Sequence, residues 1–236
     1  MLAEGLTVSV GYAVELALVL PAWLEGLARV FVVTAPDDEA TLAVCSSAGP
    51  AVVPIVTDAF TRNDASFDKG GALAEAYRGI QWAGEWRLLF DADILPPRRW
   101  AGALDGAECG NLYGAPRYQC DDLGDIPRAD LRRIPDPADE MPGFFWLFHK
   151  DDPHLPGPDA PMFSSWKHAG CYDTEFKARW CADSRRRLDI RLLHLGAPGR
   201  NWWGVGEGTK MATMYQERRE RGGYQHERIA DGVAVS

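Results

Sequence analysis

Residues 86–97 read WRLLFDADILPP, and this stretch decides which fold the rest of the chain can adopt. The apolar run Leu88–Phe90 predicts a buried strand, and Asp91 and Asp93 follow it two residues apart. In extended backbone such residues point to the same side, and open α/β sheets bind ligands at the carboxyl ends of their strands. Two close carboxylates repel each other, so a hard divalent cation such as Mg²⁺ or Mn²⁺ is their natural partner. The alternative is a simple turn, because Asp is common after strands and Pro96–Pro97 would end any element.

Length and composition fit one ordinary domain. The chain has 236 residues, of which 46% are hydrophobic, and this is enough for a sizeable core. It contains no run of about 18 apolar residues, and residues 1–10 carry Glu4 without a basic cluster, so we expect neither a membrane span nor a signal peptide. Five cysteines without a C-x-x-C pair favour neither a zinc ribbon nor a disulfide framework. We therefore expect reduced thiols and a cytoplasmic location.

The net charge of −9 at pH 7 hides an asymmetry along the chain. Residues 177–228 hold 12 Lys and Arg against 6 Asp and Glu, whereas the part before them is strongly acidic. The acidic majority argues against wholesale coating of nucleic acid, but the basic stretch leaves room for a local anionic partner.

The first 90 residues alternate between strand and helix patterns. Strands are predicted at 6–12, 29–34, 51–57 and 87–90, and helices at 14–27, 35–47 and 67–82. This order is typical of an α/β fold with a doubly wound, mostly parallel sheet. Pro54 should place the third strand at an edge, and Pro21 should kink or divide the first helix.

The pattern changes after Trp100. Further strands are predicted at 111–118, 143–149 and 188–195, with a short helix at 175–181. Charge and proline at 121–141 predict an exposed excursion. The chain from Gly206 onward has no clear apolar face, so we expect a peripheral tail, partly ordered or in contact with a partner.

Three further segments bear on the two acids. The first reads FDKGGAL over residues 67–73, where two glycines would let backbone approach a ligand, and Lys69 and the helix start favour anions. The alternative is an ordinary helix start with a solvated lysine, and the spacing of a phosphate-binding P-loop is absent.

The second segment reads GCYDTEF over 170–176, and the third reads LLHLGAPGRNWWG over 192–204. Asp173 would be either a helix cap or a general base, and Glu175 is the other carboxylate available. His194 would be either a buried structural residue or a ligand that completes the metal site. The glycines and tryptophans after it are typical of a loop that closes over a ligand.

In this order, these motifs resemble the nucleotide-sugar glycosyltransferases of the GT-A fold. The likeness is closest to the small enzymes of bacteriophages and more distant to polypeptide N-acetylgalactosaminyltransferases. It covers roughly residues 6–204. It implies a single catalytic domain at 1–204, with a nucleotide-sugar-binding half at 1–100, an acceptor and catalytic half at 101–204, and a peripheral tail at 205–236.

The resemblance also implies roles for residues on the donor side. Thr34 would lie by the nucleotide base, and Lys69 would face the donor. Asp91 and Asp93 would be the metal-binding pair, with Asp93 the direct ligand and Asp91 nearer the ribose.

The remaining roles belong to the second half of the chain. His194 would be a further metal ligand. The segment from Arg200 to Trp203 would close over the donor, and Arg200 and Trp203 would bind it. Asp173 matches the base of inverting members, although Cys171-Tyr172 stands where Gly-Glu is usual, a departure that concerns acceptor binding.

The activity so implied is Mn²⁺- or Mg²⁺-dependent transfer of a hexose or N-acetylhexosamine from a nucleotide-sugar, with a UDP-sugar the common donor, to an acceptor hydroxyl with inversion. Basic and aromatic residues in 177–228 and the phage relatives make a 5-hydroxymethylated pyrimidine in DNA a candidate acceptor, in the cytoplasm of an infected bacterium. The same residues fit a solvated helix surface and a loop over the donor equally well. A protein Ser/Thr or a glycan is the alternative acceptor. A nucleotidyltransferase and a non-catalytic nucleotide-sugar-binding protein are the alternative functions.

Overall fold

The structure, a computed structural model, describes residues 2–120, 126, 132–133, 141, 143–196, 217 and 228–229. Most of the predicted excursion at 121–141 and of the tail from 205 lies outside the described residues. Arg200 and Trp203, predicted to bind the donor, lie outside them too.

Within the described residues, seven strands form the central sheet. From one edge to the other they are β10 (Arg185–Arg187), β6 (Leu112–Gly114), β9 (Phe145–His149), β4 (Trp86–Phe90), β1 (Ala3–Val8), β2 (Arg29–Thr34) and β3 (Val52–Val56). Neighbouring strands are parallel except at β9, which runs antiparallel to β4 and β6. The predicted mostly parallel α/β sheet is confirmed, and Pro54 lies in the edge strand β3 as expected.

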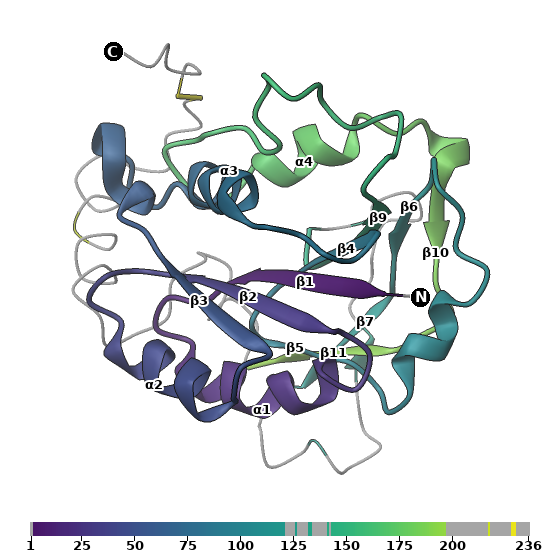
Figure 1. Cartoon of the computed structure of the whole chain (residues 1–236), viewed down its shortest axis with the longest axis horizontal. Coiled ribbons are helices and arrows are strands. Elements are labelled where there is room, and N and C mark those ends of the chain that lie inside the picture. The colour runs from purple at the N-terminus through teal and green to yellow at the C-terminus, as the bar shows by residue number, and fades with distance from the viewer. Residues whose placement is uncertain are drawn as a thin grey trace.

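A second, smaller sheet joins this one through the segment after β4. Its order is β5 (Ile94–Leu95), β11 (Leu192–Leu195), β7 (Arg117–Cys120) and β8 (Arg132–Arg133). β11 is antiparallel to β5 and parallel to β7. The small sheet lies on the same side of the central sheet as helix α1 (Ala13–Trp23) (Figure 1).

Helices cover both faces of the central sheet (Figure 1). α1 and α2 (Glu39–Ser47) lie on one face, and α3 (Lys69–Gly79) and α4 (Tyr172–Lys177) lie on the other. Short 3₁₀ helices occur at η1 (Ala59–Asp64), η2 (Trp100–Leu104) and η4 (Ala182–Ser184). None of the described helices is both long and apolar enough to cross a membrane.

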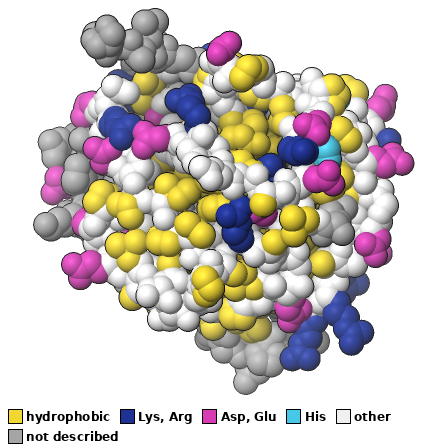
Figure 2. All heavy atoms as spheres, in the orientation of Figure 1, with side chains coloured by type: hydrophobic (Ala, Val, Ile, Leu, Met, Phe, Trp, Pro, Cys, Tyr) yellow, Lys and Arg dark blue, Asp and Glu magenta, His cyan; other side chains and the backbone are white. Residues whose placement is uncertain are grey.

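The two faces hold two apolar cores, because side chains alternate along each strand. On β4, Leu88 and Phe90 pack with α1 and the small sheet, whereas Leu89 packs with α3 and α4. A strand buried on both sides is mainly apolar, and β4 is apolar except at Arg87. Figure 2 shows one face of the molecule, where apolar side chains reach the surface and acidic ones gather mainly toward the rim.

Several predicted boundaries are wrong. The predicted strand at 111–118 is two strands in different sheets, because Pro116 between them lacks the N–H that would continue a ladder. Pro21 does not divide α1, since it lies in the last turn of a helix that ends at Trp23.

The other errors are shifts and omissions. The first strand is Ala3–Val8 and not 6–12, the last strand begins at Leu192, and the short helix begins at Tyr172. The arginine strand β10 is missing from the sequence prediction, because a run of charges carries no strand signal; at the edge of a sheet such charges are well tolerated.

Candidate functional site

The two acids of the opening stretch lie where the large sheet passes into the small one. β4 ends at Phe90, and the Asp91 N–H donates to the carbonyl of Phe144, 3.1 Å away, just before β9. A tight turn follows, closed by the Ile94 N–H on the Asp91 carbonyl at 3.1 Å. Residues 92–93 are therefore a turn and not the extended strand end that the i, i+2 argument assumed. The turn gives each acid a different partner.

Asp91 pairs with Lys69 at the start of α3. The Lys69 ammonium donates to Asp91 Oδ1 at 2.6 Å, and its side chain is only 13% exposed. It also lies over the ring of Tyr172, 5.6 Å from the ring centre. Burial alone would lower the pKa of Lys69, but Asp91 and Tyr172 outweigh burial and raise that pKa above its ordinary value. Lys69 is thus a fixed positive charge inside the site and not the solvated lysine of the alternative interpretation.

The two glycines after Lys69 are required by packing within the chain. A Cβ on Gly70 would lie 1.9 Å from the Ser164 carbonyl oxygen, and one on Gly71 would lie 2.3 Å from Asp68 Oδ2. Asp68 caps α3 by accepting from the Gly71 N–H at 2.7 Å, and it also accepts from the Trp166 N–H at 3.1 Å. The helix start that carries Lys69 is therefore pinned to the 164–166 segment.

His194 lies next to Asp93, although the two are far apart in the sequence. Antiparallel pairing of β11 with β5 sets His194 opposite Ile94, and the Leu195 N–H donates to the Asp93 carbonyl at 2.8 Å. The His194 Nε2 atom is 3.2 Å from Asp93 Oδ2. Both side chains are buried, with 6% and 5% exposed. The sequence prediction that these two residues meet agrees with this placement.

The Asp93–His194 pair has the chemistry and spacing of two ligands to one divalent ion. Neighbouring ligands of an octahedral ion, each about 2.1 Å from it, lie about 3.0 Å apart, close to the 3.2 Å between these two atoms. Within the part of the chain that the structure describes, no group of three or more His, Cys, Asp or Glu is arranged to hold a metal. Asp93 and His194 would therefore supply two positions, and phosphate oxygens and water would supply the rest, as is usual for Mg²⁺.

Tyr12 adds a polar atom to the site that sequence reasoning missed. It directly precedes α1 and is 6% exposed, and its hydroxyl has no hydrogen-bond partner among the described residues. Burial raises its pKa most, and the nearby carboxylate of Asp93 adds to the rise. A buried, unsatisfied hydroxyl beside charged groups is costly, so this position fits one that contacts a polar ligand. No pattern in the sequence marks it.

Asp173 lies on the α4 side of the same region. Asp173 is half-buried. A Cβ added at Gly143 would lie 2.6 Å from the Cβ of Asp173. Gly143 directly precedes Phe144, which accepts the Asp91 N–H, so α4 and the end of β4 are neighbours. Asp173 does not cap α4, because the cap position is Cys171. Cys171 has φ of 68°, a conformation that glycine adopts more readily.

Glu175, the other carboxylate of that segment, turns toward the C-terminal part of the chain. Its Oε2 is 3.7 Å from a guanidinium nitrogen of Arg228. The Ile229 N–H donates to the Ser165 carbonyl at 3.0 Å. Glu175 therefore has a cationic partner among the described residues.

Thr34 ends β2 and is fully buried. Its hydroxyl donates to Asp38 Oδ2 at 3.3 Å, and the same oxygen accepts from the Gly11 N–H at 2.8 Å. The Thr34 side chain thus faces Asp38. The placement of Thr34 by a nucleotide base stays a prediction, and in this arrangement the backbone of Thr34 would make the contact.

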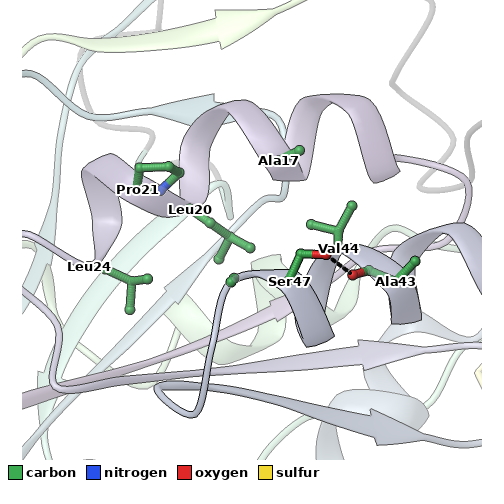
Figure 3. Close-up of a pocket in the computed structure, with 8 residues that line it drawn as sticks. Ala17, Leu20, Pro21, Leu24, Ala43, Val44 and Ser47 are labelled. Carbon is green, nitrogen blue, oxygen red and sulfur yellow. Dashed lines mark hydrogen bonds between the residues drawn. The ribbon is translucent and has the colours of Figure 1, made fainter.

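A separate pocket lies between α1 and α2 and contains none of these residues (Figure 3). It has a volume of about 500 Å³ and is lined by Ala17, Leu20, Pro21, Leu24, Ala43, Val44, Ser47 and Ala48. Ser47 is its only polar side chain, and the Ser47 hydroxyl donates to the Ala43 carbonyl at 2.9 Å. The pocket has no charged side chain and does not suit an anionic nucleotide.

Comparisons with known proteins give a fold and no family. No family model and no curated protein sequence matches the chain. Among solved structures, a mutant Drosophila β-1,4-galactosyltransferase 7 in complex with manganese, UDP-Gal and xylobiose matches with a TM-score of 0.52 at 13% identity, covering 92% of this chain and 80% of that one. HddC from Yersinia pseudotuberculosis complexed with GMP-PN also matches with a TM-score of 0.52, at 10% identity, covering 94% and 99% of the two chains.

These matches and the sheet topology define the class: the chain has the GT-A fold. The carboxyl end of β4, where Asp91 and Asp93 lie, is the edge at which sheets of this kind bind ligands.

Proposed function

We propose that this protein is a metal-dependent glycosyltransferase that moves a sugar from a nucleotide-sugar, with UDP-sugar the first donor to test, to an acceptor hydroxyl. The observation that carries the proposal is the meeting of Asp93 and His194 beside the Lys69–Asp91 pair. The structurally similar Drosophila galactosyltransferase binds manganese and UDP-Gal, which supports the same ligands here.

The residues of the donor side would divide the work by charge. Asp93 and His194 would hold Mn²⁺ or Mg²⁺, which when bound stabilises the negative charge that grows on the leaving diphosphate. Lys69 keeps the nearby Asp91 carboxylate neutralised, so Asp91 can accept from a ribose hydroxyl without repelling the phosphates. The Tyr12 hydroxyl would form a hydrogen bond with the donor. Thr34, Arg200 and Trp203 remain proposed donor contacts.

Asp173 would act on the acceptor. A carboxylate at the start of α4 takes the proton of the attacking hydroxyl, and attack on the face opposite the leaving group inverts the configuration of the sugar. Removing such a base typically costs about 10²–10⁴ in rate. We also propose a division into a donor half at 1–100 and an acceptor half at 101–204, with His194, Arg200 and Trp203 of the second half reaching the donor.

The acceptor we favour is a 5-hydroxymethylated pyrimidine in DNA, which would make this a DNA-modifying enzyme of a bacteriophage acting in the host cytoplasm. Its support is the excess of Arg and Lys in residues 177–228 and the two exposed arginines of β10, Arg186 and Arg187. DNA binding through such residues weakens steeply with salt. A protein Ser/Thr and a glycan are the acceptors to compare.

The decisive experiment incubates the protein with UDP-sugars and Mn²⁺, with and without hydroxymethylated duplex DNA, and analyses products by mass spectrometry. Release of UDP with a sugar added to the acceptor is the expected result. Pyrophosphate release would identify a nucleotidyltransferase instead, and tight binding without turnover would identify a binding protein. Transfer that is absent with DNA but present with a peptide or glycan would replace the DNA acceptor alone.

Two variants and one control sharpen the result. Asp93→Asn should abolish metal-dependent turnover, and Asp173→Asn should lower kcat by about 10²–10⁴ while nucleotide binding persists. Asp159→Asn makes the same chemical change at an exposed acid in the 151–162 loop and should leave turnover unchanged.

A further inference from the structure

Gln119, on β7, holds the ring of His194 from the side opposite Asp93. Parallel pairing of β7 with β11 sets Gln119 beside His194, so the two side chains lie on the same face of the small sheet. Gln119 Oε1 is 3.2 Å from His194 Nδ1. Gln119 is itself buried, with 5% exposed, so water does not compete freely for these contacts.

The direction of the Gln119 amide follows from its other contacts. Its Nε2 group donates to the carbonyl of Gly196 and, at 3.4 Å, to the carbonyl of His194. A carbonyl oxygen can only accept a hydrogen bond, so the NH₂ end of the amide must face these two groups. Oε1 therefore faces His194 Nδ1, and an amide oxygen can only accept. It follows that His194 Nδ1 carries a hydrogen.

The state of Nδ1 decides what the other ring nitrogen can do. A neutral imidazole has one N–H, so a hydrogen on Nδ1 leaves the lone pair on Nε2. Nε2 is the atom that lies 3.2 Å from Asp93 Oδ2. Two electron-rich atoms at this distance repel each other unless a metal ion or a second ring proton lies between them.

We propose that Gln119 is a positioning residue that fixes the Nδ1–H tautomer of His194 and so presents Nε2 as a metal ligand beside Asp93. This inference rests on the proposed metal-dependent function and names a residue that orients one of the proposed metal ligands. Partners that orient a ligating histidine typically change metal affinity by about tenfold to a hundredfold when they are removed.

The test compares Gln119→Met, which keeps length but offers only a weakly accepting sulfur, with Gln119→Glu, which still accepts from Nδ1. Gln81→Met makes the same change at an exposed glutamine and serves as the control. Two quantities are measured for each folded protein. One is the His194 tautomer in the metal-free chain, read from the neutral imidazole in a pH series of ¹H–¹⁵N NMR spectra, and the other is the Kd for Mn²⁺. The signal of His194 is assigned from its loss in His194→Gln.

We expect Nδ1–H in the original chain, in Gln119→Glu and in Gln81→Met. In Gln119→Met we expect loss of this preference and Mn²⁺ binding about tenfold to a hundredfold weaker. An Nε2–H tautomer in the original chain, or unchanged Mn²⁺ affinity in Gln119→Met, would overturn the role of Gln119 and leave the proposed function intact. If the original chain has the expected tautomer but neither binds Mn²⁺ nor transfers sugar, the proposed function and the ligand role fall together.

Discussion

At the scale of single residues, the site depends on a few contacts that leave no room for an extra atom. Gly143 is the clearest case, because Asp173 packs directly against it. The position of the proposed base is therefore set by a residue that has no chemistry of its own. Misplacement of a reacting group by about 1 Å can cost about a hundredfold in rate.

Gly143→Ala should lower kcat by about tenfold to a hundredfold although Asp173 is still present, because the new Cβ must push Asp173 aside. Steady-state kinetics with the identified acceptor would measure this. Gly157→Ala is the control, since a Cβ there meets nothing within 4 Å. Equal activity of the two variants would show that kcat does not depend on the position of Asp173 against Gly143.

The cysteines offer a second test at this scale, because their environments differ. Cys45 is buried, and burial, with Asp38 nearby, raises the pKa of its thiol to about 11. Cys181 is exposed, and a hydrogen bond with Ser184 lowers its pKa below the ordinary value. The thiolate is the reactive form, so at neutral pH Cys181 should react first with a thiol reagent.

Timed alkylation followed by peptide mass spectrometry would show the order. Raising the pH toward 11 should speed labelling of Cys45 in the folded chain only as far as reagent can enter, whereas denaturant should expose it fully. Rapid labelling of Cys45 at neutral pH without denaturant would contradict its burial.

At the scale of elements, β1 is held at its start by one buried carboxylate. Glu4 is fully buried and accepts from the Ala83 and Gly84 N–H groups, each at 2.7 Å, and from Arg29 Nε at 2.6 Å. Burial alone would raise the pKa of Glu4, but these hydrogen bonds together outweigh burial and lower it. The contact ties β1 to the turn that leads into β4, the strand that ends at the site.

Glu4→Gln should lower the free energy of unfolding by about 1–3 kcal/mol at neutral pH, because a charged acceptor of several donors is lost. A carboxyl whose pKa is depressed in the folded state contributes stability above its unfolded pKa and loses it as pH falls through the folded value. The difference between the original chain and Glu4→Gln should therefore shrink as pH falls below the ordinary value of 4.5. Urea unfolding across this range measures it, with exposed Glu85→Gln as the control.

The elements also show why sequence reasoning succeeds in some places and fails in others. The predicted bounds of β2 are correct because its middle, Val30–Val33, is covered on both faces and forms an unbroken apolar run. The two residues of β5 carry no such pattern, and their strand exists only because β11 pairs with them. That pairing brings His194 to Asp93. Sequence motifs are therefore enough to name Asp93 and His194 as a candidate metal pair. Local secondary-structure propensity, however, does not show that the two residues lie side by side.

Gln119 and Tyr12 could not have been found at all from the sequence. The role of Gln119 depends on its register against His194, and a shift of one residue would turn its side chain to the other face. The hydroxyl of Tyr12 is notable only because the surrounding fold buries it without a partner among the described residues. Such features arise from contacts between distant segments and leave no periodic signal.

At the scale of the whole molecule, the candidate site lies where the two sheets meet. Asp91 follows the last residue of β4 in the large sheet, whereas Asp93 and His194 belong to the turn and strand that start the small one. A metal and nucleotide bound there would hold both sheets and α3 at once. Ligand that binds only the folded chain should therefore stabilise the molecule as a unit.

At a concentration of about a hundred times its Kd, such a ligand adds about 2.7 kcal/mol to the free energy of unfolding. For a chain of this length, that corresponds to a rise in Tm of about 5–10 °C. We expect this rise with UDP and Mn²⁺ together and a much smaller one with either alone, because the diphosphate supplies part of the coordination of the ion. Asp93→Asn should remove most of the shift, whereas Asp159→Asn should keep it. Thermal unfolding followed by fluorescence measures these shifts, and an equal shift in both variants would place the ligand away from the joint between the sheets.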